Sequence, residues 1–250
     1  MAWLGIAMLT AGAAAAATFS NFGQSAQKQD KTAGELRSQS REEFESRFPI
    51  VNLSERREPP AEKRAETQAK EKKLKRGQLP ITEYAGNIFT VTHWETKLPA
   101  LPVTESQAVV IARVVDAKAH LSEDGTFVYS EFTVKLDEVV KSDGDAGLAP
   151  HNAIAVLRMG GRVKFPSGHV TLQLIKGQNM PRLGWQYVLF LTRSGGHDDY
   201  QILTGFELRG DSVFLLDAPA EGHPMYRYQG ADRESFLNDL RSAASGLSQS

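Results

Sequence analysis

Apolar and polar residues alternate with a period of two over most of the chain after Ile81, a pattern typical of β-strands. The clearest example is Thr126–Val140, in which Val128 and Val134 lie on an apolar face and polar residues occupy the alternate positions. The alternation slips near residues 138–140, which predicts a bulge or bend. We therefore expect one long, bent strand in this stretch.

Two further stretches, Gln107–Ala117 and Gln186–Thr192, are apolar at nearly every position. Strands of this kind are expected to be covered on both faces, because neither face carries the polar residues that favour solvent. The remaining predicted strands are shorter: Asn87–Thr92, Ala153–Met159, Arg162–Phe165, His169–Ile175, Tyr200–Gly205 and Ser212–Leu216.

Turn-forming residues separate the predicted strands. Ser122–Gly125 predicts a hairpin between the two longest strands, because Asp-Gly favours a tight turn. A helix is predicted at the carboxyl end, over residues 231–244, where Phe236 and Leu240 repeat at helical spacing and Asp232 is a suitable N-cap. Further turns are predicted at 142–151, 160–161, 166–168, 195–197 and 209–211.

About eight short strands without intervening helices argue against a parallel α/β sheet. The predicted fold class is mainly β: an antiparallel OB-like barrel or a sandwich with a carboxyl-terminal helix. Closing the sheet into a barrel also removes its exposed edges. We expect this domain over residues 79–250, after an apolar amino-terminal segment (residues 1–22) and a charged flexible spacer (residues 23–78).

The amino-terminal segment predicts that the chain is exported across a membrane or anchored in one. Ala2–Ala17 contains no charged side chain, and the first one after it is Lys28. Such a run is typical of a signal peptide or a membrane anchor. Alanines before Thr18 favour signal cleavage there, whereas extension of the apolar stretch to Phe22 favours an uncleaved anchor. We expect an exported protein, periplasmic or extracellular, or one anchored in the cell membrane through residues 2–22.

The spacer is rich in charged residues, Gln and Ser. Between Lys28 and Arg76 lie 14 of the 29 basic and 10 of the 30 acidic residues, so the rest of the chain holds 15 basic and 20 acidic residues. This composition buries too little apolar surface to offset the entropy of ordering. Solvated or frayed helix is predicted over residues 34–47 and 60–76.

The basic cluster Lys70–Arg76 has two interpretations. It can contact anionic lipid headgroups, or it can be the solvated end of a helix, and we favour the second. No aromatic residue interleaves the cluster and the rest of the chain is net acidic, so we expect no nucleic-acid partner. The absence of cysteine excludes disulfides, thiolate metal sites and cysteine nucleophiles.

Residues Gln107–Asp143 resemble the first hairpin of netrin-like domains, the OB-fold barrels that include tissue inhibitors of metalloproteinases. In that hairpin an apolar strand with a V-x-A-x-V rhythm, here Val110–Val114, precedes a long bent strand and a lysine, here Lys141. The resemblance implies an OB-like barrel. Those inhibitors chelate the protease zinc through an amino-terminal cysteine, and this chain has none. The layout of the whole chain also resembles that of uncharacterised exported bacterial proteins.

Histidine and serine motifs give no predicted catalytic or metal site. The six histidines lack metal-ligand spacing, and the densest polar group, His197–Asp199, lies beside two glycines and is interpreted as a hairpin tip. Gly210–Ser212 is similar to an esterase nucleophile block, and Arg209–Ser212 spells an adhesion tripeptide followed by serine. Both fall in a predicted turn, so we assign neither a role.

Two other groups could form a binding face. Gly160–Arg162 could approach a ligand closely, although a tight turn between strands is the favoured interpretation. Trp185, Tyr187 and Tyr200 could form an aromatic face, although packing within the sheet is favoured.

The sequence thus predicts a non-enzymatic, exported or membrane-tethered envelope protein that binds or assembles with an unknown protein partner, without cofactor or metal. Two alternatives are a hydrolase with a dispersed site at His197, Asp198 and Asp199, and a lipid-surface protein that uses Lys70–Arg76. No catalytic residue is assigned in the main hypothesis.

Overall fold

The computed structural model describes residues 42–55, 68, 81, 83, 88–93, 97–144, 148–193 and 199–247, with only the backbone for 88–93. The predicted segments 1–22 and 60–76 lie outside these residues, apart from helical Gln68, whereas residues 42–46 are helical as predicted. Within the described ranges, no helix combines the length and apolar character that a membrane crossing requires. The strands belong to one compact unit, Arg47–Ser250.

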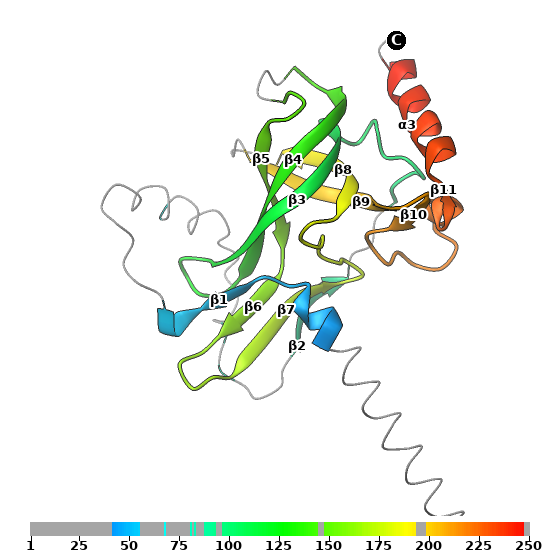
Figure 1. Ribbon diagram of the computed structural model, residues 1–250. Coiled ribbons are helices and arrows are strands. Elements are labelled where there is room, and N and C mark those ends of the chain that lie inside the picture. Colours follow the sequence, from blue (N-terminus) through cyan, green and yellow to red (C-terminus); the bar gives the residue numbers. More distant parts are fainter. Residues whose placement is uncertain are drawn as a thin grey trace, which may run out of the picture. The chain divides into compact units, whose positions relative to one another are not determined.

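The elements of this unit are strands with one long carboxyl-terminal helix (Figure 1). In chain order they are β1 (Ile50–Asn52), η1 (Leu53–Glu55), β2 (Ile88–His93), β3 (Ala108–Leu121), β4 (Val128–Ser142), β5 (Ala153–Met159), β6 (Gly161–Lys164), β7 (Val170–Lys176), β8 (Gln186–Arg193), β9 (Tyr200–Arg209), β10 (Ser212–Leu215), η2 (Pro224–Tyr228), β11 (Ala231–Asp232) and α3 (Arg233–Leu247).

Five strands pair in a closed, barrel-like ring, so of the two predicted forms of the mainly β fold, a barrel or a sandwich, the barrel is the one observed. The larger sheet has the order β11-β10-β9-β5-β4-β3-β8, and β8 also pairs with β9. Four of the five pairings in the ring are antiparallel, and the pairing of β5 with β9 is parallel. The sequence did not predict this parallel pair, but an odd number of strands in a closed ring cannot alternate in direction throughout.

A second sheet has the order β1-β6-β7-β2. Its centre is the antiparallel hairpin β6–β7, and β1 and β2 add to it in parallel. Strand β1 lies within the stretch predicted as spacer, so the compact unit begins earlier than residue 79. The reason is local: Phe48 stands in an apolar island of that stretch, and its side chain is fully buried.

The long hairpin β3–β4 follows the predicted pattern. Its register shifts between Val109 and Val110, opposite Lys141 and Val139, so Val140 is the extra residue of a bulge where the alternation slips. Residues 108–112 of β3 and 187–191 of β8 are buried on both faces, as predicted, whereas Arg113 and Val115, within the same predicted stretch, are exposed. Alternate side chains of these two strands point into the interior of the ring and outward against α3.

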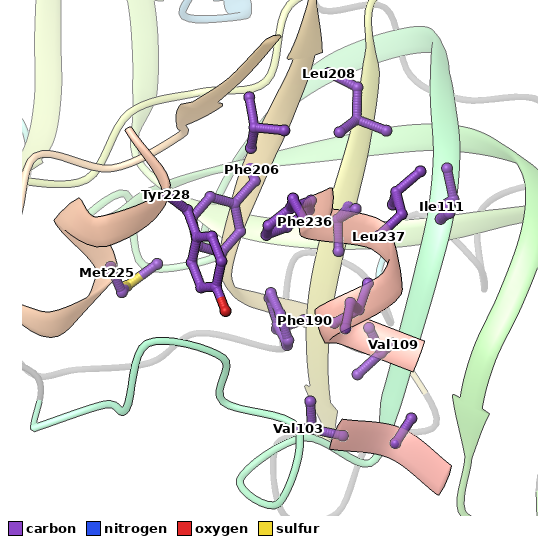
Figure 2. Close-up of a cluster of buried hydrophobic side chains, with 14 residues drawn as sticks. Val103, Val109, Ile111, Phe190, Phe206, Leu208, Met225, Tyr228, Phe236 and Leu237 are labelled. Carbon is purple, nitrogen blue, oxygen red and sulfur yellow. The ribbon is translucent and has the colours of Figure 1, made fainter. Parts of the chain in front are cut away.

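Helix α3 packs over one side of the ring (Figure 1). It begins after Asp232, whose Oδ1 accepts a hydrogen bond from the Ser235 amide at 2.9 Å, as expected of an N-cap. Phe236 and Leu237 enter a core cluster with residues of β3, β8, β9 and η2 (Figure 2). In this cluster Phe206 is the centre of the aromatic contacts, with ring centroids 4.9–6.1 Å from three neighbours: Phe190, Tyr228 and Phe236.

The glycine pair that joins β5 to β6 lies so close to neighbouring strands that neither position has room for a side chain. A Cβ atom on Gly160, whose φ is +103°, would lie 2.9 Å from the carbonyl oxygen of Gln173. A Cβ atom on Gly161 would lie 2.5 Å from Cγ1 of Val128. Arg162 binds the segment before β1, with its amide donating to the Pro49 carbonyl at 2.8 Å. Residues Gly160–Arg162 therefore join the two sheets, in agreement with the favoured interpretation.

Replacing Gly160 with alanine is expected to lower the free energy of unfolding by about 3 kcal/mol, because left-handed strain and a backbone clash combine. Gly168 is the matched control, since its φ is +93° and no described atom lies within 4 Å of a Cβ placed there. Gly168→Ala should cost about 1–2 kcal/mol through strain alone. Urea denaturation measures both, and equal losses would show that the contact with Gln173 contributes nothing.

Candidate functional site

The three aromatic residues singled out in the sequence do not form one exposed face. Tyr187 and Tyr200 are buried in the sheet, as the packing interpretation predicts. Trp185, which precedes β8, is half-buried instead. It lies in the wall of an open pocket of about 330 Å³. This pocket is the candidate site.

Residues distant in sequence meet at this pocket because three strands are in register there. Arg113 of β3 pairs with Gln186 of β8, and Gln186 pairs with Leu208 of β9. The first residue of α3, Arg233, adds a third side. We call this site the arginine pocket and define it by its lining residues: Arg113, Gly184, Trp185, Gln186, Leu208, Arg209, Gly210 and Arg233.

Arg209 is the most firmly held cation of the arginine pocket. Its guanidinium lies 5.0 Å from the ring centroid of Trp185 and 4.7 Å from that of Phe214. Its Nε and Nη2 both donate to Oε1 of Glu207, at 2.8 and 2.6 Å. Arg182 lies 5.2 Å from the Trp185 ring centroid. The indole is thus held by cation–π contacts with two arginines.

The other two cations are fixed by neutral oxygen atoms. Nη1 of Arg113 donates to the Gly184 carbonyl at 2.8 Å, and Nη2 of Arg233 donates to Oε1 of Gln186, also at 2.8 Å. The Gln186 amide in turn donates to Asp137 Oδ2 at 2.7 Å. Within the described residues, neither Arg113 nor Arg233 has a carboxylate partner, and each has N–H donors beyond the one that bonds the neutral oxygen.

A buried polar group underlies the wall of the arginine pocket. The Tyr187 hydroxyl accepts from the Arg182 amide at 2.9 Å and donates to Glu207 Oε2 at 3.4 Å. Burial raises the pKa of Tyr187 far above its ordinary value, so its phenol stays neutral and donates to the carboxylate. Glu207 is therefore satisfied by Tyr187 and Arg209 and does not neutralise the other arginines.

This arrangement suits anion binding. A guanidinium presents a planar fork of donors that matches carboxylate or phosphate oxygens, and it remains protonated at all physiological pH values. Anchored guanidinium groups need little further ordering when a ligand arrives. The lining residues otherwise supply an amide, an indole and apolar or glycine surface.

Among the remaining sequence candidates, the predicted turn at 209–211 contributes Arg209 and Gly210 to this pocket. His197 and Asp198 lie outside the described residues, as does Lys70–Arg76. Gly210 and Asp211 form the turn between β9 and β10, within the predicted bounds, and Gly210 has a φ of +56°; Ser212 is the first residue of β10. In the part of the chain that the structure describes, no group of three or more His, Cys, Asp or Glu could hold a metal ion.

Sequence reasoning named Arg209 only as part of a predicted turn and missed Arg113 and Arg233, so it did not predict that the three arginines meet. They lie 96 and 24 residues apart along the chain, so no local motif contains them. A usable signal did exist: Arg113 interrupts an apolar strand, and Arg209 follows another directly. Only the strand register shows that both positions lie at one place.

No protein-family model matches the sequence, and no curated protein gives a significant match.

Proposed function

We propose that this protein is an exported or membrane-tethered component of the cell envelope, whose OB-like barrel is a non-catalytic module that binds another protein. The apolar run Ala2–Ala17 supports export or tethering. The charged composition of residues 23–78 supports a solvated connection between that run and the barrel. The arginine pocket supplies the binding site, where it holds an anionic group of the partner.

The single observation that carries this proposal is the unbalanced charge of the arginine pocket. Arg113 and Arg233 are anchored by a carbonyl and an amide oxygen rather than by carboxylates. Outside residues 28–76, acidic residues outnumber basic ones by 20 to 15. Two neighbouring arginines without carboxylate partners, in a part of the chain that is otherwise net acidic, favour binding of an anionic group from another molecule.

The residue types that line the arginine pocket suit a binding role rather than a catalytic one. Catalysis requires a nucleophile or a titrating acid or base beside the bound group. The lining guanidinium groups neither lose a proton nor attack, and Gln186 and Trp185 supply only neutral donors and acceptors. The function proposed therefore needs no cofactor.

A photocrosslinking experiment in the producing cells tests the binding role. Benzoylphenylalanine at Leu183, an exposed position next to Gly184, is expected to give a discrete protein adduct that Arg113→Glu with Arg233→Glu reduces at least tenfold. Arg241→Glu is the control for a charge reversal outside this pocket, because Arg241 bonds Glu138 and lines a different pocket. The proposal is contradicted if the adduct persists in the variant with both arginines replaced by glutamate, or if the protein with its arginines intact gives no adduct.

Intact mass measured on separated cell fractions tests the location. An exported soluble form that begins at Thr18 means a cleaved signal peptide, and a full-length form in the membrane fraction means an anchor. Either result supports an envelope protein. Full-length protein confined to the cytosol contradicts it.

A further inference from the structure

Two exposed apolar residues flank the part of the chain that builds the arginine pocket: Leu183 precedes the lining residue Gly184, and Val115 follows Val114, whose backbone bonds Gly184 and Trp185. Leu183 is 62% exposed and Val115 is 47% exposed, and they are two of the few large apolar side chains that solvent reaches in the described residues. The loop that carries Leu183 is bound to β3: the Gly184 amide donates to the Val114 carbonyl at 2.8 Å, and the Val114 amide donates to the Trp185 carbonyl at 3.0 Å. We call Leu183 and Val115 the apolar rim.

We infer that the arginine pocket and the apolar rim together bind a short protein segment in which a carboxylate side chain stands next to an apolar one. This inference rests on the proposed function and names the chemistry of the partner. The carboxylate meets the donors of Arg113 and Arg233, and the apolar side chain covers Leu183 and Val115. Two exposed apolar residues beside a cationic pocket are thereby removed from water.

The balance of charge favours one or two carboxylates over a polyanion. Arg209 is already paired with Glu207, which leaves two arginines for the ligand. Nucleic acids and anionic bilayers carry many charges over a wide area, and they require a broad basic surface. The barrel domain has the opposite excess of charge.

The size of the arginine pocket favours a short segment. Its volume of about 330 Å³ lies at the lower end of the range for small-molecule sites, roughly 300–1,000 Å³. A pocket of this size takes the side chains of one or two residues, and the flanking residues of the segment then lie over the rim.

Three capped hexapeptides with a fluorescent label provide the probes, tested on the purified full-length chain by fluorescence anisotropy. They are Gly-Asp-Leu-Asp-Leu-Gly, the equally charged Gly-Asp-Ser-Asp-Ser-Gly and the neutral Gly-Asn-Leu-Asn-Leu-Gly. The first is expected to bind at least about tenfold more tightly than the other two. Its affinity should fall as salt is raised, because exposed charges are screened.

Two pairs of variants assign the two halves of the site. Leu183→Ser should remove most of the preference for the leucine peptide over the serine peptide, whereas Val170→Ser, an exposed apolar position in the second sheet, should leave it unchanged. Arg113→Gln with Arg233→Gln should weaken both acidic peptides about tenfold or more, whereas Arg241→Gln should not.

The outcomes separate this inference from the proposed function. Equal binding of the leucine and serine acidic peptides, with both dependent on Arg113 and Arg233, overturns the apolar half and leaves anion recognition standing. Acidic peptides that bind independently of these arginines, or do not bind, overturn both. Stronger competition by phosphatidylglycerol vesicles or oligothymidine than by unlabelled leucine peptide overturns the assignment to a carboxylate segment.

Discussion

Asp217→Ala is expected to lower the free energy of unfolding by about 3–5 kcal/mol, a large part of the stability of a domain of this size. Asp217 is buried and binds Nη2 of Arg158, whose residue is 2% exposed. Without the carboxylate, the buried Arg158 guanidinium has lost its ion partner, and among the described residues its Nε and Nη1 already have no hydrogen-bond partner.

The same carboxylate joins several parts of the barrel. Its Oδ2 accepts from the Thr204 hydroxyl of β9 at 2.9 Å, and its Oδ1 accepts from the Asn179 amide at 3.0 Å. Arg158 belongs to β5, so Asp217 ties the segment after β10 to both members of the parallel strand pair. Loss of this group leaves buried donors unsatisfied as well as a buried charge.

Urea denaturation measures this loss against a matched exposed pair. Asp116 contacts Lys118 at 2.8 Å, but both side chains are about half exposed or more, so Asp116→Ala should change stability by less than about 1 kcal/mol. Replacement of both members of the buried pair, Arg158→Met with Asp217→Leu, should recover most of the loss. Similar small effects of Asp217→Ala and Asp116→Ala would show that the buried pair is not a structural tie.

The strands were predictable because their pattern is local. Burial on one face produces the alternation of Thr126–Val140, and burial on both faces produces the apolar run of β8. The terminal helix was predictable from Phe236, Leu240 and the cap at Asp232 for the same reason. Ring closure through a parallel β5–β9 pair depends on contacts between distant strands, which no local pattern records.

The candidate site was predictable only in fragments. The sequence analysis singled out Trp185 and the segment Arg209–Ser212, but it did not predict that Arg113 and Arg233 line the same pocket. Their proximity follows from register, in which Arg113 stands opposite Gln186. The buried Arg158 shows why an arginine in an apolar strand does not by itself predict a binding site. The local sequence pattern is the same whether the arginine binds a ligand or a buried carboxylate such as Asp217.

The packing of α3 connects the stability of the barrel to the arginine pocket. Arg233 opens the helix, and its amide donates to the Asp211 carbonyl at 2.9 Å while its side chain reaches Gln186. Three residues later, Phe236 packs at 4.9 Å from Phe206 and 5.0 Å from Tyr228, measured between ring centroids (Figure 2). The position of one pocket cation therefore depends on an aromatic contact in the core.

Phe236→Ala is expected to destabilise the protein by about 3–5 kcal/mol, because it leaves a cavity among Phe206, Tyr228 and Leu237. Phe236 is 1% exposed, so nearly the whole side chain is lost from the core. Where the variant remains folded, it should also bind the acidic leucine peptide more weakly, since the helix that holds Arg233 has lost its main anchor. Urea denaturation and fluorescence anisotropy on the same sample measure the two effects.

Tyr226→Ala is the matched aromatic truncation for this second effect. Tyr226 is 40% exposed and donates a single hydrogen bond to the Pro219 carbonyl at 3.0 Å. It should cost about 1 kcal/mol and leave peptide binding intact. If Phe236→Ala destabilises the protein but binding stays at the level of Tyr226→Ala, the position of Arg233 does not depend on the aromatic anchor. The pairing of β3 with β8 at Arg113 and Gln186 is then sufficient to hold the pocket residues in place.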